Sequence, residues 1–187
     1  MRIGLIHLIV ALLIPTYLIY IFLRLLFIKK FKLKIKYEVI RLIFLAYLIC
    51  SLSILWFNPV PNLEHVPLNI IPFKTIISYF LDYWGGNLSF FIMVSNLLGN
   101  VLLTLPLGFF IYIKNKNLSF KQILLISFFT PLIIELVQLS LHFLQLGTRI
   151  VDIDDIILNM LGIVSGYYLV KFLFYRDSSK LKVLNME

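Results

Sequence analysis

Residues 90–113 read FFIMVSNLLGNVLLTLPLGFFIYI, and this run of 24 residues contains no charged side chain. A transmembrane helix needs about 20 consecutive, mostly apolar residues. Four more stretches qualify when the chain is divided at charged clusters and at Pro or Gly turns: about Ile3 to Ile28, Ile40 to Phe57, Gln122 to Leu146 and Ile153 to Phe174. The sequence therefore predicts an all-α integral membrane protein, a bundle of about five transmembrane helices.

The composition agrees with this fold class. Hydrophobic residues make up 61% of the 187-residue chain and charged residues 14%, with a mean hydropathy of +0.99. Soluble domains have about 45–50% apolar and about 25% charged residues, so an ordinary soluble domain is excluded. The net charge of +8 comes from Lys and Arg residues that separate the apolar runs, so we expect no nucleic-acid partner. The single cysteine, Cys50, excludes an internal disulfide.

The same divisions give four segments. Residues 1–57 form two spans with a basic cytoplasmic loop, 58–89 an extracytoplasmic interfacial segment between the second and third spans, 90–174 a three-helix core, and 175–187 a cytoplasmic tail. Within the second segment, the aromatic-rich stretch Ile76 to Trp84 predicts a short helix at headgroup depth, where aromatic rings are favoured.

The loop charges predict the orientation in the membrane. Twelve Lys and Arg residues lie in the first loop, the third loop and the tail, and three lie on the opposite side. Because cytoplasmic loops carry the excess of Lys and Arg, the N-terminus is expected outside and the C-terminus in the cytoplasm. The basic first loop is expected to contact anionic membrane lipids.

Polar residues inside the last three spans follow the helical repeat. Ionisable groups there cost roughly 2.5–3.5 kcal/mol each on insertion scales, which makes them candidates for a functional site. In the third span, Asn96 and Asn100 are four residues apart and share a face. The fourth span carries one polar stripe: Pro131, Glu135, Gln138, His142 and Gln145. The fifth carries another, from which Asp154 points away: Asp152, Asp155, Asn159, Gly162 and Gly166.

Three helices thus present polar faces at overlapping depth, and turning these faces toward one another is the cheapest arrangement. We expect a polar cavity that opens to the outer leaflet. Its candidate ligand-binding residues are Asn96, Asn100, Glu135, Gln138, His142, Arg149, Asp152, Asp155 and Asn159.

A purely structural interpretation stands beside this one. Asn and Gln often join helices, and the Gly162 to Gly166 spacing lets backbones approach closely. Taken alone, His142 is more typical of a histidine at the membrane interface whose ring nitrogens already have hydrogen-bond partners. The acids that begin the fifth span could simply complement the helix dipole. Glu135 is different, because a carboxylate near the bilayer centre must be protonated or paired.

Several motifs resemble a known family in their order and spacing. They are LNIIPF at 68–73, GNVLLTLPLG at 99–108, ELVQ at 135–138 and RIVDIDDIILNMLG at 149–162. Together they resemble the VanZ-like family over about Leu68 to Lys171, whereas Arg2 to Lys36 has no aligned counterpart. The matching positions are Asn69, Pro72, Phe73, Asn100, Pro106, Gly108, Glu135, Gln138, Asp152, Asp155, Asn159 and Gly162.

The resemblance implies a polytopic protein of the bacterial cytoplasmic membrane. Founding members of the family accompany glycopeptide resistance clusters and lower the susceptibility of Gram-positive bacteria to teicoplanin-type lipoglycopeptides. Many other members have no known link to an antibiotic. For this chain the resemblance therefore implies antibiotic resistance or another role in the cell envelope, without implying a reaction.

Three functions remain open from the sequence. The first is a non-enzymatic role in which the cavity binds a lipoglycopeptide or an envelope lipid. The second is an intramembrane enzyme that modifies a lipid-linked envelope precursor, with Glu135, Asp152 and Asp155 as catalytic candidates and Asn159 beside them. No dedicated metal site or cofactor is predicted, although the acidic cluster could hold a divalent cation through oxygen ligands. The third, a proton-coupled transporter with Glu135 as relay, is disfavoured because the chain shows no inverted repeat.

Overall fold

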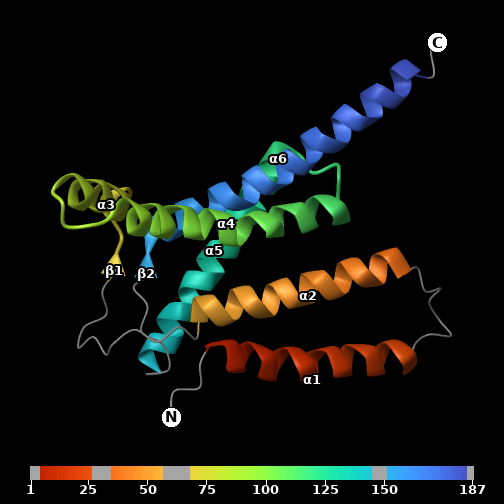
Figure 1. The fold of residues 1–187 in the computed structure, drawn as a ribbon, viewed down its shortest axis with the longest axis horizontal. Helices are drawn as coiled ribbons and strands as arrows, with labels where there is room; N and C mark the ends of the chain where they lie inside the picture. Colours follow the sequence, from red (N-terminus) through yellow and green to blue (C-terminus); the bar gives the residue numbers. More distant parts are fainter. Residues whose placement is uncertain (1–4, 27–34, 57–67, 145–150, 185–187) are drawn as a thin grey trace. The chain divides into compact units, whose positions relative to one another are not determined.

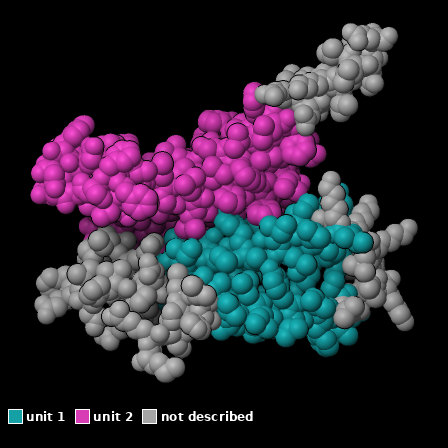
Figure 2. Space-filling view, viewed as in Figure 1, with its two compact units in different colours: residues 1–62, 141–149 teal, residues 63–140, 150–187 magenta. Residues whose placement is uncertain are grey.

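The computed structural model describes residues 5–26, 35–56, 68–144 and 151–184. The chain divides into two compact units, which Figure 2 shows in different colours. The hairpin unit contains residues 1–62 and 141–149, and the core unit contains residues 63–140 and 150–187. Each unit is described by itself.

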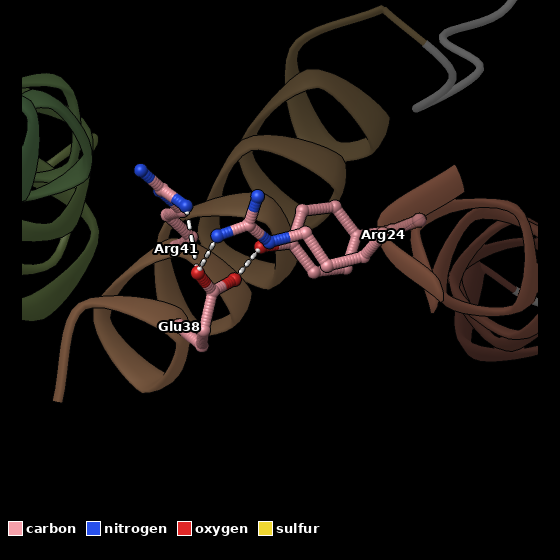
Figure 3. A network of polar contacts seen from close by, with 4 residues as sticks. Arg24, Glu38 and Arg41 are labelled. Carbon is pink, nitrogen blue, oxygen red and sulfur yellow. Dashed lines mark hydrogen bonds and ion pairs between the residues drawn. The ribbon is translucent and has the colours of Figure 1, made fainter. Parts of the chain in front are cut away.

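The hairpin unit is built from two apolar helices, α1 (Leu5–Leu26) and α2 (Ile35–Trp56). Tyr17 donates to the carbonyl of Leu42 at 3.0 Å, and Arg24 pairs with Glu38, so the helices run antiparallel. Glu38 is the centre of a polar network (Figure 3). Its carboxylate accepts hydrogen bonds from Tyr20, Arg24 and, at 2.8 Å, Arg41. These donors compensate a charge that an apolar helix alone could not accommodate.

The core unit contains the other elements. In chain order they are β1 (Leu68–Asn69), α3 (Lys74–Trp84), α4 (Phe90–Lys114), α5 (Phe120–Phe143, in this unit through Ser140), β2 (Val151–Asp152) and α6 (Ile153–Leu184). The strands pair in parallel, with Leu68 opposite Val151 and Asn69 opposite Asp152. This pairing joins the segment before α3 to the start of α6.

Helices α4 and α6 pack closely and run parallel (Figure 1). A Cβ on Gly162 would lie 2.2 Å from Thr104 Oγ1, one on Gly166 2.0 Å from the Leu105 carbonyl oxygen, and one on Gly108 2.1 Å from the Ile163 carbonyl oxygen. No side chain fits at these distances, so the two backbones meet there because all three positions are glycine.

The apolar core lies where the last turns of α4 and the start of α5 meet the middle of α6. It consists of Tyr112, Ile123, Ile163, Tyr167 and Val170. The Tyr167 hydroxyl, buried with its ring, donates to the carbonyl of Lys116 at 3.0 Å and accepts the N–H of Leu118 at 3.2 Å. A residue of α6 thereby holds the turn between α4 and α5.

The structure confirms the helical membrane fold. Within the described residues, four helices are long and apolar enough to cross a membrane: Tyr37–Trp56, Phe90–Lys114, Phe120–Phe143 and Ile153–Phe174. The described apolar part of α1, Ile9–Arg24, is shorter, so the first span stays a prediction. Two features were not predicted: the parallel pairing of β1 with β2, and the continuation of α6 beyond Phe174 to Leu184.

Candidate functional site: a polar cluster where α6 begins

Asp152 anchors the segment that precedes α3. Its Oδ1 accepts hydrogen bonds from Asn69 Nδ2 at 2.8 Å and from the Asp154 N–H at 2.9 Å. Its Oδ2 accepts the Thr75 hydroxyl at 2.5 Å, and that hydroxyl in turn accepts Asn69 Nδ2 at 2.9 Å. The strand pairing places Asn69 directly opposite Asp152, which explains how these side chains meet. Both carboxylate oxygens of Asp152 are therefore used in holding residues 69–75 against α6.

Asp154 caps the N-terminus of α3 from a distant part of the chain. Its carboxylate is fully buried and accepts the backbone N–H groups of Phe73 at 2.5 Å, Thr75 at 2.8 Å and Ile76 at 3.1 Å. The first N–H groups of a helix have no partner within it, and a negative charge there complements the helix dipole. Phe73 itself provides no side-chain cap and has φ 65°, in the left-handed region. Asp154 thus satisfies donors that the local sequence leaves unpaired.

A second group of contacts joins α4 to α6, starting from Asp155 in the first turn of α6. Asn100 donates its side-chain N–H to the carboxylate of Asp155. One turn further along both helices, the Thr104 hydroxyl bonds to the carbonyl of Asn159 at 2.9 Å and to the carbonyl of Asn100 at 3.0 Å. Asn159 is 1% exposed, and its side-chain Oδ1 has no hydrogen-bond partner among the described residues.

Helix α5 presents a buried face that includes three polar residues. The face consists of Ile123, Ser127, Pro131, Glu135 and Gln138. Glu135 is 2% exposed, and its Oε2 accepts the backbone N–H of Asp152 at 3.3 Å. Carboxylate and amide groups from three helices therefore gather around the start of α6. We call Asn100, Glu135, Asp155 and Asn159 the polar cluster.

Comparison with known families identifies the chain. The family described as VanZ/LLP1 matches residues 44–175, well over half of the sequence. The chain belongs to the VanZ/LLP1 family. The match begins within α2 and contains the whole polar cluster, and it starts earlier than the motifs that the sequence alone brings out. No curated protein and no solved structure showed significant similarity.

Not every candidate residue of this VanZ/LLP1 protein joins the cluster. Asn96 is exposed on α4. The α4–α6 contacts advance in equal steps along both helices, so α6 begins opposite the turn before Asn100 and provides no partner for Asn96. His142 belongs to the hairpin unit, and Arg149 lies outside the described residues, as does Gln145. Gln138 is buried on the same face of α5 as Glu135.

The structure also gives roles to residues that the sequence analysis passed over. Asp154 points away from the stripe of Asp155 and Asn159, and in that direction it reaches the backbone of α3. Thr75, which follows Lys74, and Thr104, which lies within an apolar run, carry no pattern that singles them out in the sequence. The spacing of Thr104, four residues after Asn100, indicates that both lie on the same face of the helix.

The chemistry available at the cluster is that of oxygen acceptors with few amide donors. Such groups suit a ligand that carries hydroxyl or amino donors. Within the parts of the chain that the structure describes, no group of three or more His, Cys, Asp or Glu residues is arranged to hold a metal ion.

Proposed function

We propose that this VanZ/LLP1 protein lowers susceptibility to teicoplanin-type lipoglycopeptides by binding the lipidated drug or an envelope lipid at the polar cluster. The observation that carries the proposal is the buried Asn159 Oδ1, which lacks a hydrogen-bond partner among the described residues and lies one turn from the Asn100–Asp155 pair. A buried acceptor without a partner costs about 1–3 kcal/mol. A ligand donor that reaches this oxygen atom would remove that cost.

Exposed apolar surface on α4 and α5, at the same level along these helices as the cluster, supports a lipidated ligand. Leu98 and Leu102 on α4 are 48% and 61% exposed, and Ile133 and Leu136 on α5 are 58% and 53% exposed. These residues occur along the same stretches of α4 and α5 as Asn100 and Glu135. At 100° per residue, Leu98 and Leu102 lie about 160° from Asn100, so they face outward on α4, on the side from which an acyl chain would approach.

The proposal is tested by drug susceptibility in a sensitive Gram-positive host. The host expresses the wild-type chain, Asp155→Asn, Glu135→Gln or the control Ser140→Ala, each checked for equal membrane abundance. Ser140 is exposed on α5, and its hydroxyl bonds within its own helix, to the carbonyl of Leu136 at 2.8 Å. We expect wild type and Ser140→Ala to protect against teicoplanin and not against vancomycin, and both cluster variants to lose this protection.

Direct binding separates the drug from an envelope lipid as the ligand. Purified wild-type protein is titrated with labelled teicoplanin and, in parallel, with labelled vancomycin. Preferential binding of teicoplanin that Asp155→Asn weakens supports capture of the drug. The resistance proposal would be refuted if folded protein bound teicoplanin and vancomycin equally or bound neither, and if the cells were not protected.

A second candidate function, an intramembrane enzyme, is favoured by Glu135. Its carboxylate is 2% exposed and lies 3.3 Å from the Asp152 N–H, an environment in which burial can tune a general acid or base. Asp155, which accepts the side-chain N–H of Asn100 in the first turn of α6, would be a second catalytic carboxylate. Turnover of a lipid-linked envelope precursor with Mg²⁺, lost in Glu135→Gln and retained in Ser140→Ala, would support this function.

A further inference from the structure

Helix α3 has two distinct faces. At 100° per residue, Lys74, Ser78 and Asp82 lie within an arc of about 80°, and the large apolar residues lie in a separate arc of about 100°. The apolar residues are Ile77, Phe80, Leu81 and Trp84. A short helix with this division is typical of segments that lie in the plane of a membrane surface.

The apolar face of α3 is uncovered by the rest of the described chain. No residue of α3 is buried, and Ile77, Leu81 and Trp84 are 53%, 60% and 75% exposed. The exposed apolar surface continues into the first turn of α4, where Phe90 and Phe91 are 60% and 78% exposed. Because α4 is long and apolar enough to cross the membrane, the medium against its first turn is lipid. The apolar face of α3 continues this surface, so lipid is expected to contact it as well.

Both ends of α3 are held next to the first turns of α4 and α6. Asp154, in the first turn of α6, caps its N-terminus, and a tight turn follows its C-terminus, with the N–H groups of Asn87 and Leu88 bonded to the Asp82 carbonyl at 2.9 and 3.1 Å. Helices α4 and α6 both begin at this end of the core unit (Figure 1). Since spanning helices begin near the lipid–water boundary, α3 is fixed at that depth.

We propose that α3 is an interfacial helix that lies in the lipid–water boundary at the membrane face where α4 and α6 begin. Ile77, Phe80, Leu81 and Trp84 contact the upper part of the acyl chains, and Lys74, Ser78 and Asp82 face headgroups and water. Tyr83 and Trp84 are the residue types that membrane interfaces favour. This inference is independent of the ligand proposed for the polar cluster.

The test uses the two tryptophans of the chain, Trp56 and Trp84. Trp56→Phe leaves Trp84 as the only reporter, and the full-length variant is reconstituted in phosphatidylcholine–phosphatidylglycerol vesicles. The lipids carry bromine either close to the headgroup or close to the chain end. We expect bromine near the headgroup to remove most of the Trp84 emission and bromine near the chain end to remove much less.

Two outcomes would overturn the inference: no quenching at either depth, or stronger quenching by bromine near the chain end. Matched variants in the Trp56→Phe background show that the apolar face is responsible. Leu81→Lys should reduce quenching by bromine and increase quenching by aqueous iodide, whereas Ser78→Lys on the polar face should leave both unchanged. Equal effects of these two variants, in protein that elutes as wild type on gel filtration, would also contradict the proposal.

Discussion

The carboxylate of Asp154 accepts the backbone N–H of Thr75 at 2.8 Å, across 79 positions of sequence. The same carboxylate serves Phe73 and Ile76, so one side chain in the first turn of α6 satisfies the open N-terminus of α3. With the Asp152 contacts to Asn69 and Thr75, it makes the segment before α4 part of the core unit. The region around the polar cluster therefore depends on both acids for its shape.

Removing the Asp154 carboxylate should destabilise the core unit. Asp154→Ala leaves three N–H groups at the start of α3 without their acceptor. We expect the free energy of unfolding to fall by about 1–3 kcal/mol. Thermal unfolding of purified protein in detergent measures the change. Asp82→Asn is the control, since Asp82 lies on the exposed polar face of α3. Equal unfolding temperatures for the two variants would show that the cap contributes nothing.

The glycine contacts between α4 and α6 should not tolerate a side chain. Gly166→Ala would place a Cβ 2.0 Å from the Leu105 carbonyl oxygen, so the helices must separate, at a cost of about 1–3 kcal/mol or more. The yield of folded protein and its unfolding temperature should both fall. Gly99→Ala in α4 is the matched control, because a Cβ there would meet nothing within 4 Å. A Gly166→Ala protein as stable as Gly99→Ala would contradict the close packing.

The Tyr167 hydroxyl should stabilise the turn between α4 and α5. Tyr167→Phe keeps the buried ring and removes the bonds to Lys116 and Leu118, which should cost about 0.5–1.5 kcal/mol. Hydrogen exchange of the Leu118 amide should become faster. Tyr168→Phe removes a neighbouring hydroxyl that makes none of these loop contacts, so it should leave that exchange rate unchanged. Slow exchange in both variants would rule out the role given to Tyr167.

Glu38 should hold α1 to α2 in the hairpin unit. Glu38→Gln removes the charge that pairs with Arg24 and Arg41, so we expect α1 to release more readily. Limited proteolysis within residues 27–34 of purified protein should then become faster. Glu38→Asp keeps the charge and is the comparison. Proteolysis at the wild-type rate in Glu38→Gln would mean that apolar contacts alone hold the hairpin.

The local pattern of the sequence predicted much of the fold. A spanning helix is encoded by about 20 neighbouring apolar residues, so α2, α4, α5 and the membrane part of α6 could be located without knowledge of their partners. The helical repeat also placed Glu135 and Gln138 on one face of α5, and that face is buried. Both inferences use only the spacing of residues within one helix.

Contacts between distant segments could not be obtained in this way. Asn96 and Asn100 have the same residue type and share a face, yet only Asn100 lies opposite α6 and bonds to Asp155. Asp152 and Asp154 both bond to Thr75 in the first turn of α3, through its hydroxyl and its backbone N–H, whereas the neighbouring Asp155 bonds to Asn100 in α4.

The sequence by itself determined the membrane fold and the polar faces of its helices. In lipid each spanning helix must satisfy its own backbone hydrogen bonds, so its residues alone encode it. The tertiary structure alone decided which acids hold α3 in place and which join the polar cluster. The physical reason is that a hydrogen bond forms only where a donor reaches an acceptor. The register of α4 against α6 and the pairing of β1 with β2 determine those positions.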